Sequence, residues 1–383
     1  MGEKRLELAA SSNGIKDVGD MIQFGQSCAR VCYSAKDFSG LQDEQVNEAL
    51  QGRLISSGHH SVFEHPTLTF NFINWPKAFM MVLNNEKQYA TSEKSARYTQ
   101  MSDMPSEQKV LYDKWMNILI PRIDSVYPEM QDSKKRMVAI KKLAQENARY
   151  MTSVFTPTKM VHTLNLRQLN FLQGEFEKFV PEYVGGEDLF KVRLAKEMQD
   201  FLEQTQQYRI EKLDNQTDRH LSFFTDKRVE EHFGDVYSHG NIMSFAGLAQ
   251  AHRHRTINYS IFSGTDLGAS EEFFIPPLIN LDDKLKQQWI GDLSSVAKND
   301  FPQAQMLRIN ETGTIDDFRS KAFLRICGHP QYEIMQNTKI TANHYDAFID
   351  RYGSQALMPK CQQGIKCHEP CVWGGKKALE RLI

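Results

Sequence analysis

The chain lacks the features that mark secreted, membrane or nucleic-acid-binding proteins. Its 6 cysteines do not suggest a disulfide framework in a chain of 383 residues. No apolar run reaches the roughly 18–20 residues of a membrane span, and no apolar signal core follows the first residues. The formal net charge of −2 gives no overall attraction to nucleic acid or to an anionic membrane. We therefore expect a cytoplasmic protein without membrane or nucleic-acid partners, in which any anion site is built locally.

One nucleotide-binding pattern is also missing. None of the 22 glycines forms the Gly-x-Gly-x-x-Gly pattern, so a Rossmann-type dinucleotide site is not expected. Charged residues make up 25% of the sequence and hydrophobic residues 40%, as in ordinary globular proteins. The length suffices for two domains of ordinary size.

The first half of the sequence alternates helical and strand-like patterns. Residues 1–20 form a polar stretch without a clear period, and residues 43–57 have a helical pattern. Polar and apolar residues alternate over 67–74, which predicts a half-buried strand. Pro76 then opens a helix to about residue 87, and a polar loop is expected over 91–97.

Longer helices are expected next. A helical region is predicted over 106–150, with breaks near Pro121 and Pro128. A further helix is predicted over 165–179, with Asn165 as its N-cap.

The second half repeats the order of the first. Glu64-His65 precedes the first strand, and Glu231-His232 precedes a strand-like stretch near 236–241. That stretch leads into a helix over 245–250 and a polar segment. We interpret this as a diverged internal duplication, with domains over residues 1–210 and 211–350 and a tail over 351–383.

The most informative segment is Arg253-His254-Arg255, which is followed after seven residues by Ser263. Arginine presents a planar fork of donors that fits phosphate and carboxylate groups. The cluster therefore predicts a site for a planar anion such as a nucleotide or a flavin. The alternative is a solvated basic helix face. The preceding Gln250 could read a base edge or be an ordinary helix amide.

This segment resembles the signature of the flavin-dependent thymidylate synthases. Other segments that resemble the family follow in the family's order. They are residues 58–65, 93–98, 146–149, 163–167 and 324–334. The resemblance covers roughly residues 25–180 and 225–345.

The resemblance implies an α+β fold of two diverged domain copies, each an antiparallel sheet flanked by helices. It also implies C5 methylation of dUMP to dTMP, with methylenetetrahydrofolate, FAD and NADPH. Because the flavin carries the chemistry, the protein would hold flat anionic ligands in a stack. The family implies a homotetramer, to which a homodimer of this two-domain chain would be equivalent.

The resemblance assigns a first group of residues to the nucleotide. Ser95, Arg97 and Arg149 would bind its phosphate, since a hydroxyl and two guanidiniums suit phosphate oxygens; the alternative is a polar surface loop. Arg325 would be the catalytic residue, stabilising charge on the pyrimidine carbonyl oxygens; the alternative is an ion pair with Glu333. The remaining substrate-binding candidates are Glu93, Gln250 and Ser263.

A second group is assigned to the cofactor. Arg253, His254 and Arg255 would bind the flavin pyrophosphate and ring edge. His59 corresponds to a position near the folate and flavin rings, although an isolated histidine is often structural. The other cofactor-binding candidates are Ser61, Glu64, Asn165, Arg167 and His329.

The two halves depart from the family at complementary positions. The first half has Asn85-Glu86-Lys87 where Arg-His-Arg is expected, and Glu175 where the second half has Arg325. The second half has Gln305 near where the phosphate-binding arginine is expected, whereas the first half keeps Arg149. The second half also continues as Ser263-Gly264-Thr265-Asp266 where Ser-Gly-Arg-Tyr is expected. Random decay of one copy would not give this complementarity, so we expect composite sites built from both halves.

Cysteines gather near the C-terminus, outside the family pattern. The candidate zinc ligands are Cys361, Cys367, His368 and Cys371. Three thiols and an imidazole suit tetrahedral zinc, although the paired Cys-x2-Cys spacing is absent. The cysteines could instead be buried as small hydrophobes. Cys28 and Cys32 lie one helical turn apart and are expected to pack in the core.

Two other functions stay open. The same scaffold could methylate UMP, or hydroxymethylate UMP or dUMP, because the residues near the ribose 2′ position cannot be identified. Alternatively, the protein could bind flavin or nucleotide without catalysis, and the missing motif copies would reflect lost activity.

Overall fold

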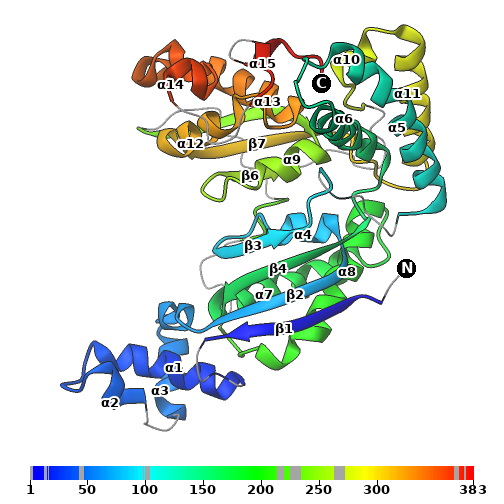
Figure 1. Ribbon diagram of the computed structural model, residues 1–383. Coiled ribbons are helices and arrows are strands. Elements are labelled where there is room, and N and C mark those ends of the chain that lie inside the picture. Colours follow the sequence, from blue (N-terminus) through cyan, green and yellow to red (C-terminus); the bar gives the residue numbers. More distant parts are fainter. Residues whose placement is uncertain are drawn as a thin grey trace. The chain divides into compact units, whose positions relative to one another are not determined.

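The computed structural model describes residues 3–12, 15, 17–42, 47–97, 99, 104–213, 220–224, 234–262, 272–365, 371–374 and 377–383. The described chain divides into two compact units, each made of two stretches (Figure 1). Unit 1 is Met1–Lys94 with Pro157–Leu221, and unit 2 is Ser95–Thr156 with Ser222–Ile383. Residues 95–156 of the first half therefore belong to unit 2. The division into related halves near residue 210 stays a prediction.

Unit 1 is built around one antiparallel sheet among its described residues, with the strand order β1-β2-β4-β3. Its elements are β1 (Arg5–Ser11), α1 (Val18–Val31), α2 (Phe38–Gln42), α3 (Glu48–Ser56), η1 (His60–Glu64), β2 (Thr67–Pro76), α4 (Lys77–Leu83), β3 (Tyr89–Glu93), β4 (Pro157–Asn165), α7 (Leu166–Tyr183), α8 (Leu189–Thr205) and η3 (Gln206–Tyr208).

The core of unit 1 lies between the sheet and its helices. Alternate β2 side chains are buried, which confirms the predicted strand. The Phe72 ring stacks on Phe201 of α8, with ring centroids 6.2 Å apart. Phe79 of α4 packs against Phe176 of α7. Asn165 caps α7 as predicted, because its side chain accepts a hydrogen bond from the Gln168 backbone N–H at 2.7 Å.

Three expectations for unit 1 were wrong. Residues 5–11 form strand β1, which pairs with β2 at the edge of the sheet. The side chains of β1 are mostly exposed, so buried and exposed residues do not alternate along it as they do in a half-buried strand. Residues 91–93 belong to β3 and pair with β4, although a loop was expected over 91–97. Cys32 is exposed, and only Cys28 is partly buried.

Unit 2 contains a second antiparallel sheet among its described residues, with the order β5-β7-β6. Its elements are α5 (Ser106–Val126), α6 (Ser133–Ala148), η2 (Arg149–Met151), β5 (Val236–Ser244), α9 (Phe245–Ala251), β6 (Asn258–Ile261), α10 (Pro277–Asn280), α11 (Asp283–Ala297), β7 (Met306–Thr314), α12 (Ile315–Arg325), α13 (Tyr332–His344), α14 (Asp346–Tyr352), η4 (Ser354–Leu357), η5 (Lys360–Gln363) and α15 (Lys377–Glu380).

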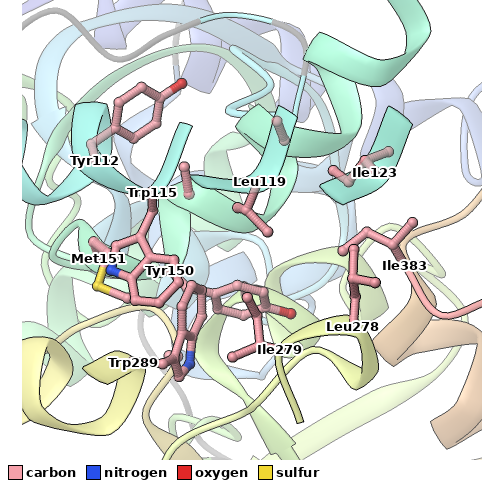
Figure 2. Packing of buried hydrophobic residues seen from close by; sticks show 14 of the residues in the cluster. Tyr112, Trp115, Leu119, Ile123, Tyr150, Met151, Leu278, Ile279, Trp289 and Ile383 are labelled. Atoms are coloured by element: carbon pink, nitrogen blue, oxygen red, sulfur yellow. The ribbon is translucent and has the colours of Figure 1, made fainter. Parts of the chain in front are cut away.

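The larger core of unit 2 joins helices from distant parts of the sequence. Trp115 of α5 meets Trp289 of α11 edge to face, with ring centroids 4.6 Å apart (Figure 2). Tyr150 of η2 also packs against Trp289. Leu278 and Ile383 lie in the same cluster. Fully burying one such aromatic side chain stabilises the fold by roughly 1.5–3 kcal/mol, so α5, α6 and η2 are held by partners in the second half.

Helix α5 continues through Pro121, although a break was expected there. Proline removes one N–H from the helix ladder. Pro121 is exposed, so the freed carbonyl can face water, while buried Leu119 and Ile123 anchor the helix on both sides. The break near Pro128 is confirmed between α5 and α6. No helix in the described ranges is both long and apolar enough to cross a membrane.

The two sheets share one order of elements. In each, a strand leads into a seven-residue helix, a short strand follows, and a nine-residue strand returns to the middle of the sheet. Asn165 and Thr314 cap the helices that come next. Arg325 is the eleventh residue of α12, and the eleventh residue of α7 is buried Phe176. This count places Phe176, one residue beyond Glu175, at the same position of its helix, and the correspondence of Glu175 with Arg325 stays a prediction.

Candidate functional site

Arg149 lies in unit 2 where α6 ends and the 3₁₀ turn η2 begins. Only 4% of the residue is exposed, and burial lowers the pKa of its guanidinium. Its Nη2 donates to Gln331 Oε1. Its Nε has no hydrogen-bond partner among the described residues. A buried guanidinium with an unfilled donor is suited to bind an anion.

Gln331 is the centre of a buried polar network that the sequence did not reveal. Its Oε1 accepts from Arg149 and also from Nε2 of Gln250, at the end of α9. Its Nε2 donates to the Tyr150 hydroxyl. The network therefore joins a candidate phosphate-binding arginine to a candidate base-reading amide.

Glu333 closes this network on the other side. Its carboxylate accepts hydrogen bonds from the Tyr150 hydroxyl at 2.6 Å, from the Ser244 backbone N–H at 2.6 Å and from the Ser244 hydroxyl at 2.7 Å. Burial raises the pKa of Glu333, and these hydrogen bonds oppose the shift. A Cβ at Gly247 would lie 2.8 Å from Glu333 Oε1, so glycine allows the carboxylate to approach the first turn of α9.

Arg325 and His254 form the next part of the site. Arg325 lies in the last turn of α12, and its Nε donates to His254 Nε2 at 2.7 Å. Its Nη2 lies 3.4 Å from the Gln250 backbone oxygen, which accepts a hydrogen bond. Burial lowers the pKa of His254 to about 2, with further contributions from the charges of Arg325 and Lys321. His254 is therefore neutral and acts as an acceptor that orients the arginine.

A buried ion pair lies near this histidine. Lys321 of α12 and Glu311 of β7 contact each other with fully buried side chains. The Tyr237 hydroxyl donates to the same carboxylate at 2.6 Å. Burial lowers the pKa of Lys321, and Glu311 opposes that shift. The pair connects the strand beneath the site to the helix that carries Arg325.

Arg97 lies beside a cavity of about 260 Å³ in unit 2. Its guanidinium pairs with Glu146 of α6 and donates from Nη2 to the His329 backbone oxygen at 2.9 Å. The cavity is lined by basic, acidic and apolar side chains, including Lys142 and Trp373. Ser95 lies two residues before Arg97, and its hydroxyl accepts from the Arg97 backbone N–H at 3.4 Å.

The structure thus brings together candidates from both halves of the sequence within unit 2. Arg97 and Arg149 come from the first half, whereas Gln250 and Arg325 come from the second. Of the Arg-His-Arg segment, His254 is buried and Arg253 and Arg255 are exposed. The His329 side chain is exposed.

Other cofactor candidates lie in unit 1. Arg167 and Glu64 form an ion pair at 2.6 Å, with each side chain 41% exposed. His59 and Ser61 lie at the start of η1, a few residues before Glu64, and both are exposed. Asn165 is the N-cap of α7, so its side chain has a structural role there.

Some candidates lie apart from these groups or outside the described residues. Glu93 is in unit 1, where its buried carboxylate pairs with Lys77 at 2.7 Å. Ser263, Cys367 and His368 lie outside the described residues. Cys361 is exposed, and the described part of the chain holds no group of three potential metal ligands. The zinc site stays a prediction.

Arg381 is a second residue that sequence reasoning missed. It is 5% exposed, and its guanidinium donates to the backbone oxygens of Cys327, Gly328 and Pro330. These carbonyls belong to the loop between Arg325 and Gln331. An arginine in a short C-terminal stretch carries no sequence signal for this contact, because its partners lie more than 50 residues away.

Comparisons with known proteins agree on one family for the first half. Residues 21–173 match the family model described as thymidylate synthase complementing protein. The flavin-dependent thymidylate synthase of Pyrococcus furiosus is 25% identical over 153 residues, covering 37% of this chain and 59% of that protein. The synthase of Clostridium tetani is 29% identical over 180 residues, covering 38% and 66%. The chain therefore spans less than two thirds of the length of these relatives.

Two solved structures are also similar. The UMP/dUMP methylase PolB from Streptomyces cacaoi bound with 5-Br dUMP is 18% identical, with 52% of this chain and 91% of that chain covered and a TM-score of 0.32. Thymidylate synthase X from Helicobacter pylori with FAD and dUMP is 15% identical, with 55% and 99% covered and a TM-score of 0.32.

Proposed function

Because residues 21–173 match the family model described as thymidylate synthase complementing protein, we propose that this protein is a flavin-dependent methylase of uridine nucleotides, with dUMP as the substrate and dTMP as the product. Methylenetetrahydrofolate and NADPH are the proposed co-substrates. The observation that carries the proposal is the buried guanidinium of Arg149, whose Nε is unfilled among the described residues and whose Nη2 is joined through Gln331 to Gln250.

The proposed nucleotide site uses the chemistry of each residue in unit 2. Arg149 and Arg97 are cations that suit the phosphate, and Ser95 adds a hydroxyl. Gln250 offers an amide to the base. Arg325 is held by His254 and presents a fixed positive charge, which would stabilise negative charge on the pyrimidine carbonyl oxygens during the reaction. Buried partners already hold these side chains in place, so water competes less well with the nucleotide for their hydrogen bonds.

FAD is the proposed cofactor and would supply the hydride when bound. The donor set fits it, because Arg253 and Arg255 are exposed cations on either side of a buried, neutral histidine. Guanidiniums suit the two phosphates of FAD. His329 in unit 2 is a further proposed flavin contact. The unit 1 candidates His59, Ser61, Glu64, Asn165 and Arg167 are assigned to flavin or folate only by the family resemblance.

The repeated order of elements supports an internal duplication, which we include in the proposal. Two such chains would then be equivalent to a tetramer of single domains, so a homodimer is the proposed assembly. The cytoplasmic location expected from the sequence is kept as part of the proposal.

The absorbance spectrum of the purified protein tests this function first. We expect flavin bands that bleach under anaerobic NADPH and respond to dUMP. A titration with dUMP against UMP then identifies the nucleotide. Flavin bands without turnover in the presence of dUMP and methylenetetrahydrofolate would favour a non-catalytic binding protein. Protein that takes up no flavin even after FAD is added would overturn the proposal.

A further inference from the structure

We propose that Gln331 fixes the orientation of the Gln250 amide, so that Gln250 accepts a hydrogen bond from the nucleotide and selects uracil over cytosine. This inference rests on the proposed function, because it concerns the same nucleotide site. It assigns a specificity role to one residue, Gln250, and a positioning role to another, Gln331.

The orientation of the Gln331 amide is determined by its neighbours. A guanidinium can only donate hydrogen bonds, so the Gln331 atom that faces Arg149 must be the oxygen Oε1. The Nε2 of Gln331 then faces the Tyr150 hydroxyl. That hydroxyl donates its own hydrogen bond to the Glu333 carboxylate at 2.6 Å. The direction of the chain is thus set by the guanidinium of Arg149.

This direction also decides how Gln250 is turned. Gln250 contacts the same Oε1 atom that Arg149 contacts. Its contacting atom must therefore be the donor Nε2, because a reversed amide would place two oxygens against each other. The Oε1 of Gln250 is left without a hydrogen-bond partner among the described residues. Gln250 is also buried, with only 7% of the residue exposed.

A buried, unfilled acceptor is complementary to a donor on the ligand. Leaving such an oxygen without a partner costs free energy, which a ligand N–H removes. Uracil carries an N–H at position 3, between its two carbonyl groups. Cytosine has a lone pair at the same position and would place acceptor against acceptor. An acceptor at Gln250 that cannot turn over therefore favours the imide edge of uracil.

The anchoring of α9 supports a fixed rather than a mobile amide. Gln250 lies in the last turn of this helix. Glu333 binds Ser244, which caps the same helix, at 2.6 Å and 2.7 Å. The segment Gln331–Glu333, at the start of α13, thus contacts both ends of α9.

The test measures the dissociation constants of dUMP and dCMP by calorimetry on the FAD-loaded protein. We expect dUMP to bind at least about tenfold more tightly than dCMP, the factor that corresponds to one hydrogen-bond mismatch. In Gln331→Leu the Gln250 amide can turn, so the preference should fall to about threefold or less. Gln336→Leu places the same substitution five residues further along α13 and should keep the wild-type preference.

A second variant keeps the inference testable if Gln331→Leu does not fold. In Gln331→Glu the carboxylate still accepts from both Arg149 and Gln250, so the preference for dUMP should remain. Both nucleotides should bind more weakly, because the new negative charge lies beside the phosphate-binding arginine. A lost preference in folded Gln331→Glu, or an unchanged one in folded Gln331→Leu, would overturn the inference. Wild-type protein that binds both nucleotides equally would overturn the inference alone. Wild-type protein that binds neither would overturn the proposed function and the inference with it.

Discussion

Arg325 Nε donates a hydrogen bond to His254 Nε2 at 2.7 Å. Since a guanidinium only donates, Nε2 must carry a lone pair, and the imidazole proton must sit on Nδ1. The charge of Lys321 further disfavours a second proton on the ring. The Arg253-His254-Arg255 segment therefore contains a neutral acceptor between two exposed arginines.

The pH dependence of folding should report this neutral histidine. The pKa of His254 is lowered to about 2 in the folded state from an ordinary value of 6.5. The unfolded state therefore binds more protons between these values, and stability falls as the pH drops below 6.5. Relative to His254→Asn, which cannot titrate, the wild type should lose about 2 kcal/mol of unfolding free energy between pH 7 and pH 5. Urea denaturation of both proteins at the two pH values measures the difference. Parallel losses in the two proteins would mean that His254 titrates normally in the fold.

Arg325→Ala should abolish methylation while flavin stays bound. The fixed cation is lost, and removal of one such stabilising group lowers kcat by at least about 100-fold. Steady-state turnover together with the flavin absorbance checks both parts. Arg319→Ala is the matched control, because Arg319 lies on the same helix and packs over the Tyr352 ring instead. Unchanged turnover in Arg325→Ala would remove this residue from the reaction.

Arg97→Ala should weaken nucleotide binding. Charge-assisted hydrogen bonds contribute about 1.5–3 kcal/mol each, so the dUMP dissociation constant should rise by about 10- to 100-fold. Calorimetric titration measures it. Arg122→Ala removes an arginine whose partner is Asp282 on α11's N-cap, with both side chains over one third exposed, and should leave the constant unchanged. Binding within about twofold of wild type in Arg97→Ala would place the phosphate elsewhere.

Lys321→Met should destabilise the protein strongly. The substitution leaves the Glu311 carboxylate buried without its cation, which costs about 3–5 kcal/mol. Adding Glu311→Gln removes the orphaned charge and should recover at least about half of that loss, since the Tyr237 hydroxyl can still donate to the amide oxygen. Urea denaturation of the two variants provides the comparison. A double variant no more stable than Lys321→Met would show that the charge pair is not the cause.

Sequence patterns predicted the local elements better than the site. The alternation over 67–74 and the N-cap Asn165 are local signals, and the structure has both. Strand β1 escaped notice because its side chains are mostly exposed, so backbone pairing with β2 defines it. The sequence did not predict that α5 continues through Pro121, because buried neighbours rather than helix propensity hold this helix together.

The site itself was only half visible in the sequence. Charged residues in a known order pointed to Arg97, Arg149 and Arg325. Gln331 and Glu333 stood in a segment that resembles the family, yet nothing in the sequence distinguishes an uncharged amide at a network centre from any other glutamine. Their role depends on Tyr150, which is 183 residues from Glu333. Such long-range pairing is decided by tertiary packing and cannot be read from local periodicity.

Helices α5 and α6 come from the first half of the sequence but belong to unit 2, and this has a consequence for biosynthesis. Arg149 and Gln331 are 182 residues apart, which corresponds to roughly 10–40 s of translation at ordinary rates. During that interval the nascent chain completes the strands of unit 1, while Trp115 and its neighbours still await Trp289. We therefore expect the apolar face of α5 and α6 to stay without its packing partners until the second half of the chain has been synthesised.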